Sequence, residues 1–176
     1  MNTITSFRGL YNWLSNFHIF SIQDEALKVT FNPKDFPKSN RKTPYTLPLN
    51  EYSSTSSEHI YMALKALYDA ANDTAGNLMA ETILERSAAE AKRMGKAFNP
   101  CEEDKLKLMS MALNYKFRAN NELKQKLIKL KGTKLKEGNM WHDNFWGTCT
   151  CFKCEQIEGK NNLGNLLMQL SSSIET

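Results

Sequence analysis

Apolar residues recur at intervals of three and four positions from residue 55 onward, the pattern of helices that bury one face. This pattern predicts helices over residues 55–72, 102–117, 123–130 and 163–170. The stripes consist of Ile60, Leu64, Leu67 and Ala71; of Leu106, Met109, Leu113 and Phe117; of Leu123, Leu127 and Leu130; and of Leu163, Leu166, Leu167 and Leu170. We expect these stripes to form the core.

Two further helices are expected, over residues 75–85 and from Ser87 to Gly95. Ser87 followed by Glu90 is a capping-box pattern, in which each side chain satisfies a backbone N–H at the start of a helix. Glycine is common at the end of a helix, so we expect this helix to end at Gly95.

The remaining segments are shorter or irregular. Residues 133–137 alternate as a short strand does, and the clustered aromatics of residues 7–22 predict a short strand with an irregular loop. Residues 32–57 hold four of the five prolines and read as loop. The fold class is therefore mainly α, a single compact multihelical domain with a few short β-strands, spanning residues 1–176 with a basic, loop-rich insertion at about 27–50.

Composition fits a globular protein away from membranes. The chain has 176 residues, of which 41% are hydrophobic and 24% charged, enough for one domain with a core. No stretch approaches the ~18 apolar residues of a membrane helix. The N-terminus lacks a basic region followed by an apolar run, so we predict no secretory signal and a cytoplasmic protein.

Positive charge is unevenly distributed along the chain, whose net charge is +4. Residues 28–42 carry five cations, including Lys34, Lys38, Arg41 and Lys42, and residues 122–136 carry six lysines. Such tracts are able to meet phosphates, although solvated surface lysines look the same in sequence.

The cysteines raise the question of a metal. Cys149, Cys151 and Cys154 form C-x-C-x-x-C, and His142 is available as a fourth zinc ligand. No second C-x-x-C or H-x-x-H arm follows. We therefore favour a cysteine-rich loop without metal.

Glu58 has two interpretations. It follows Thr55 by three residues, so the pair matches a capping box with Thr55 as N-cap. Alternatively, Glu58 shares a helix face with Tyr61 and Lys65, at i+3 and i+7, and the three side chains line a ligand groove.

Asp143 also has two interpretations. It lies between Trp141 and Trp146 in "EGNMWHDNFWG". A carboxyl in a partly apolar site has a raised pKa and suits a general acid, and the aromatic faces suit a stacked ring. The alternative is a surface turn closed by the Asp143 side chain, with the tryptophans in the core.

Three asparagines precede or begin structured segments. Asn16, in "LSNF", is interpreted as a turn residue. Asn161 and Asn162 precede the last helix together with Gly164, either as N-cap and loop or as a place where backbone N–H groups hold a phosphate or ribose hydroxyl.

In order, the blocks "FRGLYNWLSNF", "YSSTSSEHIYMALKAL", "AKRMGKAF", "LMSMALNYKFRANNELKQKL", "LKEGNMWHDNFWG" and "GKNNLGNLLMQL" resemble those of the NADAR domain family, the YbiA-like proteins. The resemblance runs from about Phe7 to Leu170. It implies a compact, mainly helical domain and hydrolases that split the bond between ribose C1′ and a nitrogen. Members act on phosphoribosylamino-pyrimidine intermediates of riboflavin synthesis or remove ADP-ribose from nucleic-acid bases, and no cofactor is implied.

The resemblance also implies site residues. The family's S-E-H block falls on Glu58, and its lysine in the same helix falls on Lys65. The remaining blocks place Asp143, Trp146 and Gly147 in N-D-x-x-W-G, Asn16 and Phe17 in S-N-F, and Asn161 and Gly164 in N-x-L-G. One departure is Cys101, which stands where some members carry a tryptophan before the central helix.

These residues suit cleavage through an oxocarbenium-like state, which needs a carboxylate near C1′ and a group that protonates the leaving base or activates water. We take Glu58 as the main catalytic group and Asp143 as the second. Lys65 faces phosphate or keeps Glu58 ionised, Tyr61 and Trp146 pack against ribose or base, and the other site residues shape the phosphate end.

Two substrates compete in this interpretation, a small phosphoribosylamino-pyrimidine and ADP-ribose attached to a nucleic-acid base. The alternatives are a non-catalytic ADP-ribose- or NAD-binding module and a zinc-dependent interaction domain. The sequence leaves the oligomeric state open.

Overall fold

A computed structural model describes residues 2–174 of the chain. These residues form six α-helices, four short 3₁₀ helices and eight two-residue strands, which confirms the mainly α class. They group into two compact units. The central unit is Ile19–Asn121, and the terminal unit is made of the described residues in Met1–His18 and Glu122–Thr176. Each unit is described by itself.

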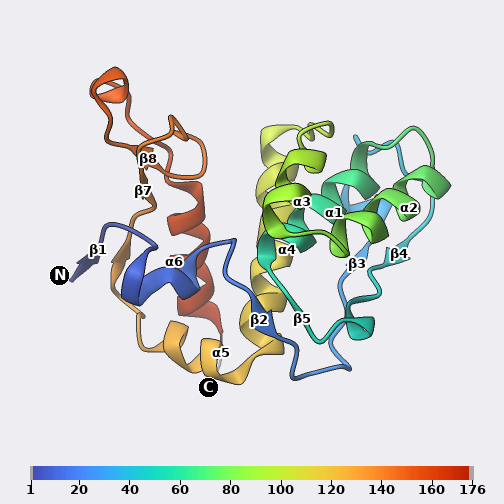
Figure 1. Ribbon diagram of the computed structural model, residues 1–176, viewed down its shortest axis with the longest axis horizontal. Helices are drawn as coiled ribbons and strands as arrows, with labels where there is room; N and C mark the ends of the chain where they lie inside the picture. The colour runs from blue at the N-terminus through green and yellow to red at the C-terminus, as the bar shows by residue number, and fades with distance from the viewer. Residues whose placement is uncertain (1, 175–176) are drawn as a thin grey trace. The chain divides into compact units, whose positions relative to one another are not determined.

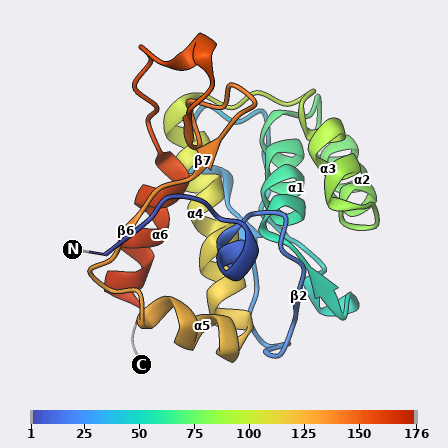
Figure 2. The same cartoon turned by 60° about the vertical axis from the view of Figure 1, so that its left-hand side comes forward.

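Helix α1 (Ser57–Asp69) is the core of the central unit. It packs against α2 (Asp73–Leu84), α3 (Ala88–Gly95) and α4 (Glu102–Ala119), and lies between α4 and the α2–α3 pair (Figure 1, Figure 2). Every α1 residue from Ser57 to Tyr68 is buried. Ile60, Leu64 and Leu67 of the predicted stripe are therefore in the core, and polar side chains are buried with them. The fourth predicted member, Ala71, is exposed, because the helix ends at Asp69.

The helix ends of the central unit follow the sequence signals closely. The side chain of Ser87 accepts from the Glu90 backbone while the Glu90 side chain accepts from the Ser87 backbone, so the predicted capping box at α3 is present. Helix α3 ends at Gly95 as predicted. The Asn72 side chain caps α2 by accepting from the Ala75 N–H.

The predicted loop-rich segment contains short regular pieces. Strand β2 (Phe20–Ser21) pairs antiparallel with β5 (Ser54–Thr55), and β3 (Thr30–Phe31) pairs antiparallel with β4 (Tyr45–Thr46). Two 3₁₀ turns, η2 (Pro33–Asp35) and η3 (Leu49–Glu51), complete it. Its aromatic rings anchor it to α1: Phe31 stacks on Phe36 with ring centroids 4.7 Å apart, and both meet Tyr68 edge-on.

The terminal unit combines the two ends of the described chain. Strand β1 (Thr3–Ile4) pairs in parallel with β6 (Lys134–Leu135), where the strand over 133–137 was expected, and β7 (Gly138–Asn139) pairs in parallel with β8 (Thr148–Cys149). Helix α6 (Asn162–Ser173) packs against β6. Helix α5 (Asn121–Ile128) leads into the unit, and η4 (Phe152–Cys154) lies in the long loop before α6.

The aromatic segment over residues 7–22 contains a short strand and an irregular stretch, as predicted. The strand is β2, and residues 9–14 of the irregular stretch form the 3₁₀ helix η1 (Gly9–Leu14). Trp13 and Leu14, at its end, are buried, whereas Leu10 and Tyr11 are exposed. The neighbours Trp13 and Leu14 thus point to the same side, whereas a strand would place them on opposite faces.

No helix in the described part of the chain is long and apolar enough to cross a membrane.

Candidate active site

Glu58 lies in the first turn of α1 and does not cap the helix. The N-cap is Ser56, whose hydroxyl accepts from the backbone N–H of His59 at 3.3 Å, and Thr55 belongs to β5. The capping box of Thr55 and Glu58 is therefore wrong, because the helix begins one residue later than that pattern requires. Glu58 is nevertheless only 4% exposed.

Lys65 is buried on the same helix as Glu58, two turns later. Its ammonium donates to the carbonyl oxygen of Gly95 at 2.7 Å and lies 5.7 Å from the ring centroid of Tyr61. Burial lowers the pKa of Lys65 to about 8, with a smaller contribution from Lys105, while the charge of Glu58 acts in the opposite direction. The predicted grouping of Glu58, Tyr61 and Lys65 is thus present in the central unit.

Gly95 allows α3 to approach α1 closely enough for this contact. A Cβ added at Gly95 would lie 2.1 Å from the sulfur of Met62 on α1. A larger residue would push the two helices apart and move the carbonyl of residue 95 away from the Lys65 ammonium.

In the terminal unit, Asp143 lies in a turn organised by Asn139, a residue that the sequence did not single out. The Asn139 side-chain oxygen accepts from the backbone N–H groups of Trp141 and Asp143, both at 3.2 Å, and its amide donates to the Asp143 carbonyl at 2.7 Å. Asn139 is 3% exposed. Its position at the end of a two-residue strand, outside any periodic pattern, gave no signal.

The Asp143 side chain closes the next turn. One carboxylate oxygen accepts from the backbone N–H groups of Phe145 at 3.1 Å and Trp146 at 2.8 Å, so the turn of the alternative interpretation exists. The accompanying expectation of core tryptophans is wrong, because Trp141 is 50% exposed and Trp146 is partly exposed. Trp146 meets Phe145 edge-on, with ring centroids 4.8 Å apart.

Glu137 is a second carboxyl group near this turn, and sequence reasoning did not select it. Its pKa is raised to about 7, mainly by burial and also by the negative charge of Asp143, while Arg8 opposes the shift. Its Oε2 atom is buried and has no hydrogen-bond partner within residues 2–174. The Arg8 guanidinium lies 4.9 Å from the Trp141 ring centroid. A proton on Glu137 near neutral pH is the property required of a general acid.

Asn161 holds the backbone that carries Glu137. Its side-chain oxygen accepts from the Glu137 N–H and its amide donates to the Leu135 carbonyl, both at 2.9 Å. Asn161 has a left-handed backbone, with φ of 51°, and although it is the N-cap residue of α6 its side chain makes no capping hydrogen bond. The predicted N-cap position is therefore confirmed, but the Asn161 side chain binds the backbone of residues 135–137 and not that of the helix.

Gly147 and Gly164 pack against the same backbone. A Cβ at Gly164 would lie 2.4 Å from the Leu135 carbonyl oxygen, and one at Gly147 would lie 2.3 Å from the Glu137 carbonyl oxygen. Both glycines are thus needed for close packing around Glu137.

The backbone N–H groups before and at the start of α6 are already used. Asn161 donates to the Gly147 carbonyl at 3.2 Å, Asn162 to that of Phe145 at 3.3 Å and Leu163 to that of Trp146 at 3.0 Å. These three donors hold the Asp143 turn onto α6, which contradicts their predicted use on a phosphate.

Asn16 and Phe17 lie after η1 in the terminal unit. Asn16 is 8% exposed and Phe17 is 40% exposed. The predicted turn is closed by Ser15, whose hydroxyl accepts from the Phe17 N–H at 3.2 Å. The exposed ring of Phe17 keeps its predicted substrate role open.

The basic tract of the central unit contains one structural arginine. Arg41 is 4% exposed, donates to the Thr43 carbonyl at 2.6 Å and to the Asn77 side chain at 2.8 Å, and lies 5.2 Å from the Tyr45 ring centroid. The expectation that Arg41 belongs to a phosphate-binding surface is wrong, because these contacts fold its segment onto α2. Lys34, Lys38 and Lys42 are exposed.

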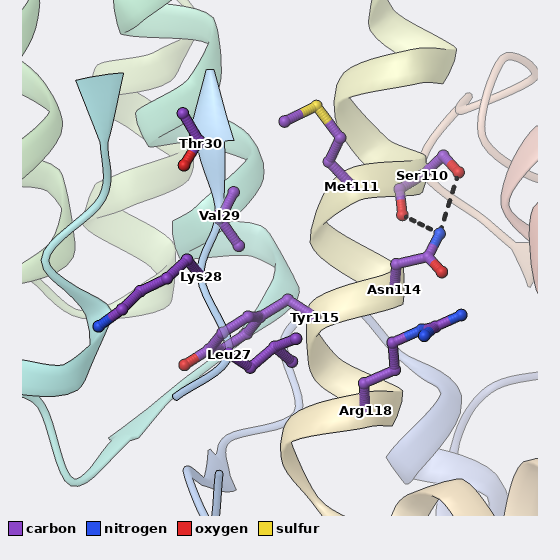
Figure 3. A pocket seen from close by; sticks show the side chains of 9 residues that line it. All are labelled: Leu27, Lys28, Val29, Thr30, Ser110, Met111, Asn114, Tyr115 and Arg118. Carbon is purple, nitrogen blue, oxygen red and sulfur yellow. Dashed lines mark hydrogen bonds between the residues drawn. The ribbon is translucent and has the colours of Figure 1, made fainter. Parts of the chain in front are cut away.

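A cavity of about 310 Å³ lies in the central unit between residues 27–30 and α4. Figure 3 shows the side chains that line it, among them Lys28, Tyr115 and Arg118. The Tyr115 hydroxyl is buried without a partner among the described residues, and burial raises its pKa to about 12. Neither Glu58 nor any other predicted site residue lines this cavity.

Comparison with known families shows which family the chain belongs to. The sequence model of the NADAR domain matches residues 6–175. The chain belongs to the NADAR domain family. The match includes Glu58, Lys65, Asp143 and Trp146.

The chain is also similar to two plant proteins and to one solved structure. The chain is 33% identical over 129 residues to "Riboflavin biosynthesis protein PYRR, chloroplastic" of Arabidopsis thaliana, covering 73% of this chain and 20% of that protein. The Zea mays protein of the same name is 35% identical over 126 residues, covering 66% and 19%. This NADAR chain therefore spans about a fifth of the length of these relatives. The NMR structure of the E. coli protein YbiA matches with a TM-score of 0.61 at 26% identity, covering 97% of this chain and 82% of that one.

Proposed function

We propose that this NADAR protein is an N-glycosidase that hydrolyses the bond between ribose C1′ and a nitrogen of an ADP-ribosyl or phosphoribosylamino compound. The observation that carries the proposal is Glu58. Its carboxylate is buried in the first turn of α1, near the buried Lys65. Ser56 caps this helix, so capping does not explain an acid at position 58. Burying a charged pair is costly and adds little net stability, so a catalytic use accounts for it better.

The reaction requires two kinds of carboxyl group. As the C1′–N bond breaks, positive charge develops on the ribose and the leaving nitrogen needs a proton, after which water adds to C1′. We assign Glu58 to stabilising the ribosyl cation and orienting the water. Lys65 holds Glu58 in its charged form or meets a substrate phosphate.

The sequence resemblance makes Asp143 the second catalytic group, and we assign the proton to a carboxyl group near Asp143 in the terminal unit. Glu137, with its pKa raised to about 7 by burial and by Asp143, is protonated at neutral pH often enough to act as a general acid. Asp143 is assigned to the ribose hydroxyls or to assisting this transfer, and Trp146 to packing against ribose or base.

Two substrate classes fit this chemistry. The names of the plant relatives refer to riboflavin biosynthesis, which supports a phosphoribosylamino-pyrimidine. The exposed lysines Lys34, Lys38 and Lys42 support a nucleic acid that carries ADP-ribose.

One assay panel tests the function and separates these classes. The full chain is incubated with ADP-ribosylated DNA, ADP-ribosylated RNA and the phosphoribosylamino-pyrimidine, and released ADP-ribose or ribose 5-phosphate is measured. We expect release from one class of substrate, and release slowed by at least roughly 10²-fold in Glu58→Gln. If the protein binds ADP-ribose in calorimetry but releases nothing from any substrate, it is a binding module and not an enzyme.

A further inference from the structure

Four potential metal ligands converge in the loop between β7 and α6 of the terminal unit. The ligand atoms of His142, Cys149, Cys151 and Cys154 all lie within 4.8 Å of one another. His142 Nδ1 lies 3.2 Å from the Cys151 sulfur and 3.3 Å from the Cys154 sulfur. In a tetrahedral zinc site, with Zn–S near 2.3 Å and Zn–N near 2.0 Å, neighbouring ligand atoms are about 3.5–3.8 Å apart. The observed spacing needs only small side-chain adjustments to match.

The backbone is arranged to bring these side chains together. His142 has a φ of 66°, a left-handed conformation that residues other than glycine rarely adopt. The Cys149 N–H donates to the Asn144 side chain at 2.8 Å, and the Cys154 N–H donates to the Cys151 carbonyl at 2.9 Å, closing the C-x-x-C segment into the turn η4. Strain of this kind persists where surrounding structure or a ligand stabilises it.

Disulfide bonding and apolar packing account for the cluster less well than a metal does. The three cysteines are free thiols in the structure, so no disulfide holds the loop. Cys149 and Cys154 are buried, yet the cluster includes the exposed imidazole of His142, which ordinary apolar packing does not require. The loop draws little stability from regular structure, since it contains only β8 and η4 (Figure 1).

We propose that His142, Cys149, Cys151 and Cys154 form a structural zinc site that fastens this loop. Three thiolates and an imidazole are a donor set typical of structural zinc, and thiolate ligands disfavour magnesium and calcium. Four protein ligands complete the tetrahedron and leave no open position for a substrate, so the ion stabilises the loop that carries Asp143 and takes no part in the chemistry. The missing second C-x-x-C arm is thus replaced by the turn at His142.

Metal content of the full chain tests the site directly. Protein purified under reducing conditions with zinc and then dialysed is analysed by inductively coupled plasma mass spectrometry. We expect one zinc per chain, near-complete loss in Cys151→Ser and in His142→Ala, and full retention in the control Cys101→Ser, whose sulfur lies in the central unit. Retention of zinc in both cluster variants would overturn the proposal.

Cobalt substitution keeps the test valid if a cluster variant fails to fold. Wild-type protein loaded with Co²⁺ is expected to show the ligand-field bands of a tetrahedral ion and a thiolate-to-cobalt charge-transfer band. The band should disappear when zinc displaces cobalt. Folded, reduced wild-type protein that binds neither ion, or a disulfide among the three cysteines found by mass spectrometry, would contradict the site. Failure of the zinc site would leave the proposed function untouched, because the glycosidase activity of the wild type is measured in a separate assay.

Discussion

Glu58 and Glu137 are both buried carboxyl groups, but their surroundings differ in kind. Glu58 lies on a long buried helix near the ammonium of Lys65, whereas Glu137 lies in an irregular segment near Asp143. A neighbouring cation favours a charged carboxylate, and a neighbouring anion together with burial favours a protonated one. The neighbours of each acid therefore set its proposed role, which is stabilising a cation for Glu58 and holding a proton for Glu137.

The strongest test of this contrast is Glu58→Gln. Removing the charge while keeping the shape should lower kcat by roughly 10²- to 10⁴-fold, with the far-ultraviolet circular dichroism spectrum unchanged. Glu103→Gln is the matched control, because that carboxylate is exposed on α4 and pairs with the surface ammonium of Lys107. Full activity in Glu58→Gln would assign Glu58 to structure alone.

Glu137→Gln is expected to lower kcat by roughly 10²-fold, since an amide cannot act as a general acid. In the wild type, activity should fall as pH rises through about 7, because Glu137 then loses its proton. The variant should lack this decline, and a pH profile of kcat measures it. An unchanged profile would exclude Glu137 as the acid.

Stability gives an independent measurement of the same group. The pKa of Glu137 is raised from 4.5 to about 7 in the folded protein, so its contribution to stability is complete below pH 4.5 and is lost as pH rises through about 7. Urea unfolding of wild type and Glu137→Gln across this range should therefore converge at low pH and diverge toward pH 8, with the variant relatively more stable. Glu158→Gln, an exposed position, should show no such divergence.

Asn161→Ala tests whether the terminal unit positions Glu137 or contacts substrate through this residue. The variant loses two hydrogen bonds to the Leu135–Glu137 backbone and places alanine at a left-handed φ. We expect a loss of about 2–3 kcal/mol in the free energy of unfolding, measured by urea denaturation. Asn162→Ala, inside α6, should change little. A raised KM with unchanged stability would instead show a direct substrate contact.

The smallest effect is expected from replacing Lys34, Lys38 and Lys42 together by glutamine. Loss of three surface charges should raise KM for an ADP-ribosylated nucleic acid by roughly three- to ten-fold at low salt. KM for the phosphoribosylamino-pyrimidine should change by less than about two-fold. KM for each substrate at two salt concentrations measures the difference. Arg41 is left intact because its contacts are structural.

The sequence predicted the regular part of the fold well. Periodicity and capping patterns located every α-helix, and the Ser87–Glu90 pair and Gly95 located both ends of α3. These signals are local, since each depends on residues within one or two turns. The N-cap of α1 was misplaced by one residue because the spacing of Thr55 and Glu58 matches a capping box. Only the pairing of β5 with β2 takes Thr55 into a strand and leaves Ser56 as the cap.

By itself, the sequence determined the helices, the burial of most residues in their apolar stripes, the family, and the placing of Glu58, Tyr61 and Lys65 on one helix, because helical spacing relates neighbours along the chain. Only the tertiary structure decided the rest. It brought Glu137 near Asp143, turned Asn161, Gly147 and Gly164 toward the backbone of residues 135–137, and gathered His142 with three cysteines. Those groupings depend on how loops fold back on short strands, and loop contacts between residues distant in sequence leave no periodic pattern to find.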